Sequence, residues 1–324
     1  MSIVFIGTPQ FAVPALRRLA ADGHHVSAVV TQPDRPAGRG LRVRASPVKL
    51  AAEELRLPVK QPPSLRDAQA IEELASLRPE VIVAVAYGQI LRQPVLDIPP
   101  RGILNVHPSL LPRWRGASPV PAAILAGDEA TGVSIILMDP GMDSGPILAQ
   151  RRHPIAPTDT AGSLLDTLST VAADLLSETL PRWLAGEIEP QPQDESLATV
   201  CPLLRKESGA IHWDRPAVDI WRAVRAYNPW PGAYSALDGE LLHIWRSWPL
   251  DFDSGSAPGT VVALSGAQRS SLPEGAPPGA FAVQTGEGLL AVLQAQRAGR
   301  RVLPADEFLR GLPGLIGRRL STPE

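Results

Sequence analysis

Cysteine is nearly missing from this chain of 324 residues, in which Cys201 is the only one. A single thiol excludes an internal disulfide and any metal site built from several thiolates. Such sparing use of cysteine is typical of a cytoplasmic protein, and we expect that location. Apolar runs are also short, since none approaches the ~20 residues that span a membrane. The opening MSIVFIGT carries no positively charged leader, so we interpret it as a strand rather than a signal peptide.

Lysine is scarce as well. Of the 31 basic residues, only Lys49, Lys60 and Lys206 are lysines. Arginine therefore has to perform nearly all recognition of anionic partners. The formal net charge of −2 gives no overall sign of a nucleic-acid ligand, so the local clustering of charge has to decide that question.

Two common nucleotide-binding motifs are missing. The first strand-to-helix turn reads GTPQFA, in which Pro9 takes the place of the second glycine of G-x-G-x-x-G. That glycine lets the backbone approach a pyrophosphate, so the turn argues against a dinucleotide site. No G-x-x-x-x-G-K-[ST] motif occurs either. The neighbouring His24 and His25 would point to opposite faces of a strand, which argues against a shared metal site, and we expect no metal.

The first half of the chain alternates between strand-like and helix-like segments. Apolar strands are predicted at 2–6, 25–31, 80–86, 103–107 and 133–138, and helices at 46–55, 64–77 and 160–184. This alternation predicts an α/β fold, a Rossmann-like parallel sheet with helices on both faces. The active crevice of such a sheet lies beyond the carboxyl ends of its strands. We assign this domain to residues 1–188.

Composition changes at 189–206, which is polar, contains several prolines and lacks periodicity, and we interpret this segment as a linker. The remainder, 207–324, is expected to form a small OB-like β-barrel, because short strand-like segments follow one another between turn residues. These segments are 209–213, 233–237, 241–247, 259–264, 279–285 and 288–296, with one helix at 221–228.

One strand of the first domain ends in the stretch ILNVHPSLLPRWRG. In a strand, Asn105 and His107 project to the same face, and Pro108 then forces the chain out of the sheet. The stretch MDPGMDSGPIL, after a neighbouring strand, offers Asp139 or Asp143 as a carboxylate partner. An amide donor for an oxyanion, an imidazole for protons and an orienting carboxylate suit acyl transfer to an amine. The alternative is structural: the amide caps a turn, the imidazole packs, and the carboxylates hold a glycine-rich loop.

The stretch N-V-H-P-S-L-L-P-R-W-R-G, followed by D-P-G-M-D-S-G-P-I-L, resembles the folate-dependent formyltransferases. The resemblance covers almost the whole chain. It implies that Asn105, His107 and Asp143 form the catalytic set, with Asp139 left to stabilise its turn. It also implies a pocket for 10-formyltetrahydrofolate lined by the four residues of the SLLP turn, namely Ser109, Leu110, Leu111 and Pro112. The Leu111–Pro112 bond is a candidate cis peptide.

Two further segments, TQPDRPAGRG and RAYNPWPGAY, resemble those members of the family that formylate the α-amine of methionyl initiator tRNA. The second domain would then hold the tRNA body. The basic segment 35–49 contains no acidic residue, so we expect its arginines to bind tRNA phosphates: Arg35, Arg39, Arg42 and Arg44. Further candidates are Arg113 and Arg115 at the entrance of the site, and the cluster Arg297, Arg300 and Arg301. No membrane and no obligate protein partner are expected.

Three other functions are consistent with parts of the pattern. A formyltransferase acting on a sugar-nucleotide amine would share the catalytic set, although it has no use for the basic segment 35–49. A hydrolase would release formate from the same folate, with water as the acceptor. A tRNA-binding protein without activity is disfavoured because Asn105, His107 and Asp143 are all present.

Overall fold

The computed structural model describes residues 1–37 and 42–323. The chain forms two compact units, each of which is considered by itself. The N-terminal unit comprises residues 1–119, 130–154 and 164–202, and the C-terminal unit comprises residues 120–129, 155–163 and 203–324. Residues 189–202 of the expected linker therefore belong to the N-terminal unit.

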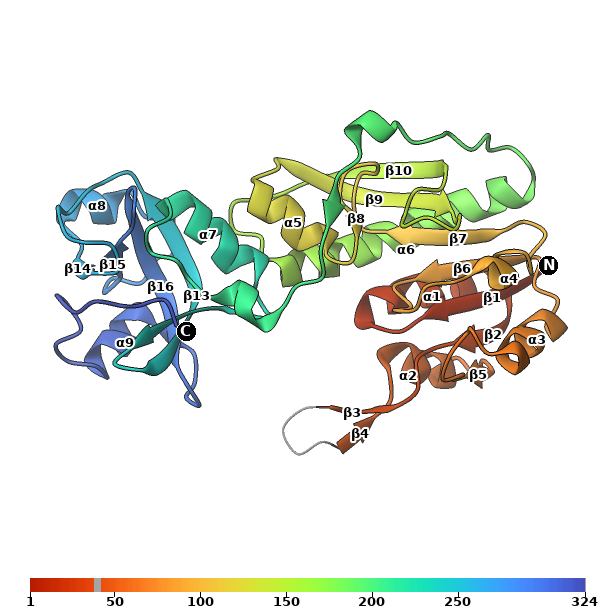
Figure 1. Cartoon of the computed structure of the whole chain (residues 1–324), viewed down its shortest axis with the longest axis horizontal. Helices are drawn as coiled ribbons and strands as arrows, with labels where there is room; N and C mark the ends of the chain where they lie inside the picture. The colour runs from red at the N-terminus through yellow and green to blue at the C-terminus, as the bar shows by residue number, and fades with distance from the viewer. Residues whose placement is uncertain (38–41, 324) are drawn as a thin grey trace. The chain divides into compact units, whose positions relative to one another are not determined.

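The N-terminal unit is built on a seven-stranded sheet in the order β10-β9-β7-β6-β1-β2-β5 (Figure 1). Neighbouring strands are parallel from β7 to β5 and antiparallel at the other edge. The bounds are β1 (Ser2–Gly7), β2 (His25–Val30), β5 (Val59–Lys60), β6 (Val81–Val85), β7 (Ile103–His107), β9 (Ala130–Leu137) and β10 (Ile147–Pro154). Of the five predicted strands, β1, β2, β6 and β7 are confirmed as parallel neighbours, and the short parallel strand β5 was not predicted.

The direction of β9 differs from the expected all-parallel sheet. Its residue Ser134 pairs with His107 and its residue Leu137 pairs with Leu104, so β9 runs against β7. The chain enters β9 beside the carboxyl end of β7. A parallel strand would require the chain to cross back first to the amino end of β7. The edge strand β10 was not predicted from the sequence. Its residues alternate between exposed and less exposed positions, with Arg152 among the exposed ones, as suits a sheet edge.

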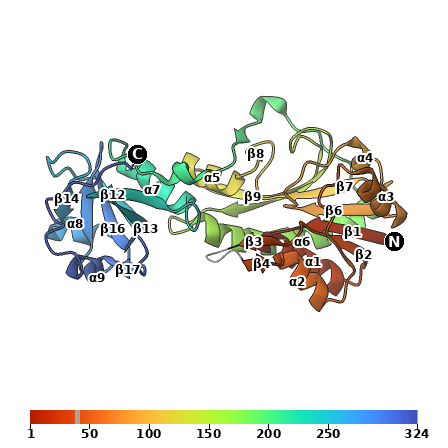
Figure 2. The ribbon, with the colours of Figure 1, turned by 60° about the horizontal axis from the view of Figure 1, so that its bottom comes forward.

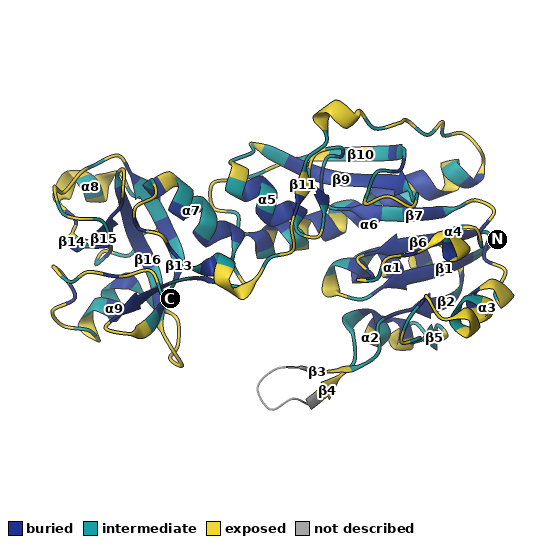
Figure 3. Cartoon of the chain, viewed as in Figure 1, coloured by how far each residue is buried: buried dark blue, intermediate teal, exposed yellow. Residues whose placement is uncertain are grey.

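Helices cover both faces of this sheet (Figure 2). Helices α3 (Ala68–Ser76) and α4 (Gln93–Leu96) pack on the face that carries Val4, Ile82 and Ile103. On the other side, α1 (Val13–Ala21) and α6 (Ala161–Leu184) are joined by an ion pair of 2.8 Å between Arg18 and Asp174. Ser46 precedes helix α2 (Pro47–Glu54), and its hydroxyl caps the helix as predicted by accepting from the Lys49 amide. Figure 3 shows the central strands as the most deeply buried part.

Two small strand pairs lie outside the main sheet. Strands β3 (Arg35–Ala37) and β4 (Arg42–Arg44) form an antiparallel pair at the base of the basic segment, and residues 38–41 between them are not described. Strand β8 (Arg115–Gly116), which follows the SLLP turn, pairs in parallel with β11 (Val200–Cys201).

The C-terminal unit is a curled antiparallel sheet in the order β12-β13-β16-β15-β14, with β17 beside β16. The bounds are β12 (Ala233–Leu237), β13 (Glu240–Leu250), β14 (Val261–Ala263), β15 (Phe281–Gln284), β16 (Leu289–Arg297) and β17 (Leu303–Pro304). Residues 317–321 bond to both edge strands, because Ser321 pairs with Ala236 and the Gly317 amide donates to Val261. This segment closes the sheet, which accounts for the predicted barrel.

Short helices complete the C-terminal part. They are α5 (Pro119–Ala126), α7 (Ala217–Ala226), α8 (Gly266–Ser270) and α9 (Ala305–Arg310). The strand predicted at 209–213 is wrong, since only Ala210 makes a single bridge, to Tyr234. The apolar residues there reflect packing: Trp213 is buried in the core and its indole donates to the Ser235 hydroxyl at 2.9 Å.

Candidate active site

Three side chains converge on one face of β7. The Asn105 Nδ2 donates to Asp143 Oδ1 at 3.2 Å, and His107 Nδ1 lies 3.6 Å from Asp143 Oδ2. The imidazole is only 6% exposed and the carboxylate 18% exposed. Because strand side chains alternate, Asn105 and His107 share the face that also carries Ile103. The structure therefore brings together the amide, imidazole and carboxylate that the sequence singled out.

Asp143 reaches this face from an unexpected direction. Because β9 is antiparallel, residues 138–146 leave the sheet beside the beginning of β7 and then fold back over its face. Met138 packs into the core on that face, and Asp143 takes a left-handed backbone conformation with φ of 53°. Gly145 is required for the return, since a Cβ there would lie 1.8 Å from the Leu137 carbonyl oxygen.

Asp139 has a different environment from Asp143. Its Oδ1 accepts from the Gly141 amide at 3.0 Å and from the Ser144 hydroxyl at 2.9 Å. Both donors belong to the same loop, so this carboxylate stabilises the turn in which it lies.

The histidine tautomer follows from a backbone contact. His107 Nε2 lies 2.9 Å from the carbonyl oxygen of Trp114. A carbonyl can only accept, so Nε2 carries a proton and Nδ1 is the nitrogen that faces the carboxylate. Trp114 is held in a left-handed conformation with φ of 64°, and its amide donates to the Thr199 hydroxyl at 2.9 Å. The tautomer is thus set by a backbone carbonyl rather than by Asp143.

A backbone donor completes the surroundings of the carboxylate. The Gly116 amide donates to Asp143 Oδ2 at 2.9 Å. Gly116 has φ of 111°, and a Cβ there would lie 2.5 Å from the Cys201 carbonyl oxygen across the β8–β11 pair. One oxygen of Asp143 therefore faces the Asn105 amide, while the other faces Gly116 and His107. Such directed donors fix the carboxylate in one orientation.

The SLLP turn is anchored from inside the sheet. The Ser109 hydroxyl donates to the Arg113 carbonyl at 2.7 Å, and the Leu111 amide donates to the Ser134 hydroxyl at 3.0 Å. The Leu111–Pro112 bond is cis, which confirms that prediction. Ser109 and Leu111 are buried, whereas Leu110 and Pro112 are half-buried. Only the last two have side-chain surface to offer to a ligand.

Arg115 lies elsewhere than the sequence suggested. Instead of facing the entrance it is buried, and its guanidinium donates to Gln193 Oε1 and to both carboxylate oxygens of Glu195. The hydrogen bond to Glu195 raises the pKa of this guanidinium further. Arg113 is exposed, and its guanidinium lies 4.3 Å from the centre of the Trp114 ring. The two arginines differ because β8 turns the second one inward.

The arginines of the basic segment are only partly described. Arg35 and Arg44 are exposed and lie directly opposite each other across the β3–β4 pair. Arg39 lies outside the described residues, as does the side chain of Arg42. Lys49 Nζ is paired with Asp34 at 2.6 Å, and this bond lowers the pKa of that carboxyl.

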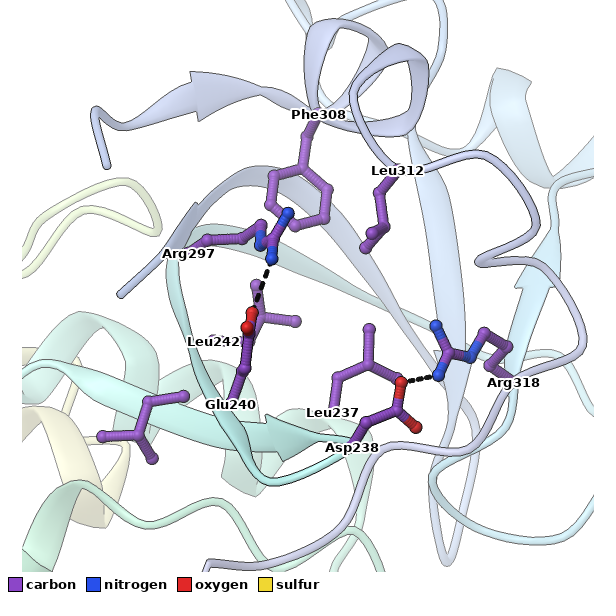
Figure 4. A pocket seen from close by; sticks show the side chains of 9 residues that line it. Leu237, Asp238, Glu240, Leu242, Arg297, Phe308, Leu312 and Arg318 are labelled. Carbon is purple, nitrogen blue, oxygen red and sulfur yellow. Dashed lines mark hydrogen bonds and ion pairs between the residues drawn. The ribbon is translucent and has the colours of Figure 1, made fainter. Parts of the chain in front are cut away.

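The C-terminal unit contains a pocket of about 180 Å³ (Figure 4). Arg297 is paired there with Glu240, and Arg318 is paired with Asp238. Nearby, Arg301 is paired with Glu307 at 3.3 Å. The predicted basic cluster at 297–301 is therefore partly neutralised by acidic neighbours, and the pocket offers paired rather than isolated cations.

Several residues of the site region escaped sequence reasoning. Residues 86–91 follow β6, the strand next to β7, and so belong to the same sheet edge. The hydroxyl of Tyr87 is buried, has no partner among the described residues, and has its pKa raised to about 12 by burial. Thr199 and Gln193 come from a polar segment with no periodicity to mark them.

In residues 1–37 and 42–323, no cluster of His, Cys, Asp or Glu could hold a metal ion. No helix in that part of the chain is long and apolar enough to cross a membrane.

Comparison with known proteins identifies the class to which this fold and site belong. Residues 1–180 match the formyl transferase family model, and residues 203–313 match the model of the formyl transferase C-terminal domain. The chain belongs to the formyl transferase family.

Its curated relatives narrow the class. The methionyl-tRNA formyltransferase of Chloroflexus aurantiacus is 51% identical over 312 residues, which covers 96% of this chain and 97% of the relative. That of Roseiflexus sp. is 50% identical, covering 99% and 95%, and that of Methylococcus capsulatus is 44% identical, covering 99% and 100%. Within its family the chain belongs with the methionyl-tRNA formyltransferases.

Solved structures are similar in fold. An N-formyltransferase from Helicobacter canadensis, in complex with folinic acid and dTDP-3-aminofucose, matches with a TM-score of 0.65 at 17% identity. It covers 91% of this chain and 98% of its own. HypX from Aquifex aeolicus in complex with tetrahydrofolic acid matches with a TM-score of 0.63 at 20% identity, covering 99% of this chain and 48% of its own.

Proposed function

We propose that this protein transfers the formyl group of 10-formyltetrahydrofolate to the free α-amino group of methionyl initiator tRNA, which gives N-formylmethionyl-tRNA. The observation that carries the proposal is the convergence of Asn105, His107 and Asp143 on one face of β7, in a chain that is 51% identical to a methionyl-tRNA formyltransferase. No covalent enzyme intermediate is needed, because the acceptor amine is itself the nucleophile.

Asn105 stabilises the charge that develops during transfer. The amine attacks the formyl carbon, a C–N bond forms, and the formyl oxygen becomes an oxyanion. One N–H of the Asn105 amide is engaged by Asp143, which leaves the second N–H to donate to that oxygen. Because Asp143 fixes the amide beforehand, little reorganisation is needed when the charge appears.

His107 and Asp143 handle the proton. The attacking amine loses a proton, and N10 of the folate gains one as its bond to the formyl carbon breaks. His107 Nε2 is committed to the Trp114 carbonyl, so Nδ1 is the nitrogen that takes and returns the proton. Asp143, 3.6 Å from Nδ1, stabilises the imidazolium while it exists.

The formyl donor requires an apolar wall next to this set. Leu110 and Pro112 are the half-buried members of the SLLP turn, and residues 86–91 border the same sheet edge. An apolar turn beside backbone polar groups suits a flat heteroaromatic ring. Within the predicted pocket we therefore assign the contact to Leu110 and Pro112, and the support of the turn to Ser109 and Leu111.

We assign tRNA phosphate binding to the β3–β4 hairpin, including Arg39 and Arg42. Like charges placed directly across two strands repel each other, yet Arg35 and Arg44 occupy such a pair and both are exposed. A polyanion bound along the hairpin would relieve this repulsion.

Charge reversal at the hairpin tests this assignment. In the double variant Arg35→Glu and Arg44→Glu, we expect KM for tRNA to rise about tenfold or more, with KM for the folate unchanged. The salt dependence of tRNA binding should become less steep by about one unit for each phosphate that the protein no longer neutralises. Arg66→Glu, at an exposed arginine outside the hairpin, is the matched control. Equal effects of the two changes would contradict a specific role for the hairpin.

A label-transfer assay tests the function itself. The protein is incubated with 10-formyltetrahydrofolate labelled in the formyl group, together with methionyl initiator tRNA. We expect the label in N-formylmethionyl-tRNA. Label in free formate would indicate the hydrolase. With an aminodeoxy sugar nucleotide as a competing acceptor, label in the sugar would indicate the alternative acceptor. A compound of this class, dTDP-3-aminofucose, is bound in the structure of the Helicobacter canadensis protein, which is 17% identical.

A further inference from the structure

Residues 191–201, which we call the strap, run along the candidate active site from a distant part of the sequence. The strap is attached at both ends. Gln191 exchanges two backbone hydrogen bonds with Ile147, of 2.8 and 2.9 Å, and β11 at its other end pairs with β8. Just before β11, the Thr199 carbonyl accepts from the Arg115 amide at 2.8 Å.

Gln193 is the strap residue whose side chain reaches the loop that carries Asp143. Its Nε2 donates to the Asp143 carbonyl at 2.8 Å and to the Gly145 carbonyl at 2.7 Å. Its Oε1 accepts from Arg115 Nε at 3.0 Å and from the Nη2 of the same guanidinium at 2.8 Å. Both N–H groups and both lone pairs of the amide are therefore used.

These four bonds join the two segments that orient the catalytic carboxylate. On one side they hold the backbone around Asp143, whose left-handed φ of 53° is uncommon for a residue with a side chain. On the other side they hold Arg115, the neighbour of Gly116, whose amide donates to Asp143 Oδ2. A displacement of either segment would move the carboxylate relative to Asn105 and His107.

We propose that Gln193 is a positioning residue for formyl transfer, which acts by holding the Asp143 loop and β8 in register so that the carboxylate meets Asn105 and His107. The expected change in kcat rests on the proposed function. The expectation that Gln193 holds the Asp143 loop and β8 in register does not depend on it. Glu195, which also binds Arg115, has a side chain that is 71% exposed and is screened by solvent. Glu195 also contacts Arg115 rather than the Asp143 loop, whereas the Gln193 amide donates directly to the Asp143 and Gly145 carbonyls of that loop.

Two variants separate the two halves of this amide. Gln193→Ala removes all four bonds. Gln193→Glu keeps an acceptor for Arg115 but cannot donate to the Asp143 and Gly145 carbonyls. Gln191→Ala is the matched control, because within the described residues its exposed side chain donates only to the Glu189 carbonyl, and its backbone bridge is kept.

We expect both Gln193 variants to lower kcat by about tenfold to 100-fold, as misplacement of a catalytic group does. KM for folate and for tRNA should change by less than about threefold, since the binding surfaces are intact. The control should retain the kcat of the unchanged protein. A kcat within about twofold of the unchanged protein for Gln193→Glu, or a loss that appears in KM instead, would overturn the proposal.

A measurement without substrate separates this proposal from the proposed function. The Gly116 amide is protected by Asp143 Oδ2, so its hydrogen exchange reports the position of the carboxylate. We expect exchange at Gly116 to accelerate about tenfold or more in both Gln193 variants, with exchange in β1 and β6 unchanged. Unchanged exchange at Gly116 would overturn the positioning role whatever reaction the protein catalyses. If exchange accelerates but the unchanged protein transfers no formyl group to methionyl-tRNA, only the proposed function fails.

Discussion

Asp143→Asn is expected to lower kcat for formyl transfer by about 10³-fold while the protein stays folded. In the unchanged protein, the Asp143 carboxylate presents one acceptor oxygen to Asn105 Nδ2 and the other to the Gly116 amide. An amide can offer an oxygen to only one side and must turn N–H groups toward the other. The substitution also removes the negative charge that, in the proposed mechanism, stabilises the imidazolium of His107. The measurement is single-turnover formylation with saturating folate and methionyl-tRNA.

Asp139→Asn is the matched control for this experiment. The two aspartates lie in the same loop, but within the described residues Asp139 accepts only from the Gly141 amide and the Ser144 hydroxyl. An asparagine oxygen can still accept from the amide, so we expect kcat to remain within about threefold. Comparable losses in the two variants would mean that the loop acts as a whole and that Asp143 has no special part.

Gly116→Ala is expected to destabilise the protein by roughly 2–4 kcal/mol and to abolish most of the activity. Its φ of 111° is unfavourable for any residue with a side chain, and the new Cβ would lie 2.5 Å from the Cys201 carbonyl oxygen. Relief requires β8 to separate from β11, which removes the amide that donates to Asp143. Urea unfolding gives the change in stability, and the same samples give kcat.

Gly186→Ala measures the cost of a side chain at a positive φ alone, without the steric clash expected at position 116. Gly186 also has a positive φ, of 75°, but nothing lies within 4 Å of its ideal Cβ position. We expect it to cost only about 1 kcal/mol, with kcat unchanged. If Gly116→Ala proves no more harmful than Gly186→Ala, the close β8–β11 pairing is not what restricts position 116.

Much of this architecture is encoded locally and could be predicted from the sequence. The apolar runs around Phe5 and Val83 became central strands, and Ser46 was recognisable as a helix cap from residue type and place alone. The two-residue period of β7 placed Asn105 and His107 on one face without knowledge of the other strands.

The remainder depends on contacts between residues far apart in sequence. Nothing local to VSIILM indicates that the strand runs against β7, so the route by which Asp143 folds back was not predictable. Arg115 looks like a surface residue in the sequence, and its burial depends on Gln193 and Glu195, 78 and 80 residues away. Polar segments such as 191–201 have no periodicity that would mark them as part of a site.

The strap also determines where this protein can be divided. The family model of the first domain ends at residue 180, before the strap begins. A chain cut there would retain Asn105, His107 and Asp143 but would lose the bonds from Gln193 and Thr199 that hold their surroundings. In domain exchange between related enzymes, the boundary that preserves the chemistry therefore lies after Cys201, where β11 ends. The unit that would carry the proposed chemistry is therefore longer than the part of the chain that the first family model matches.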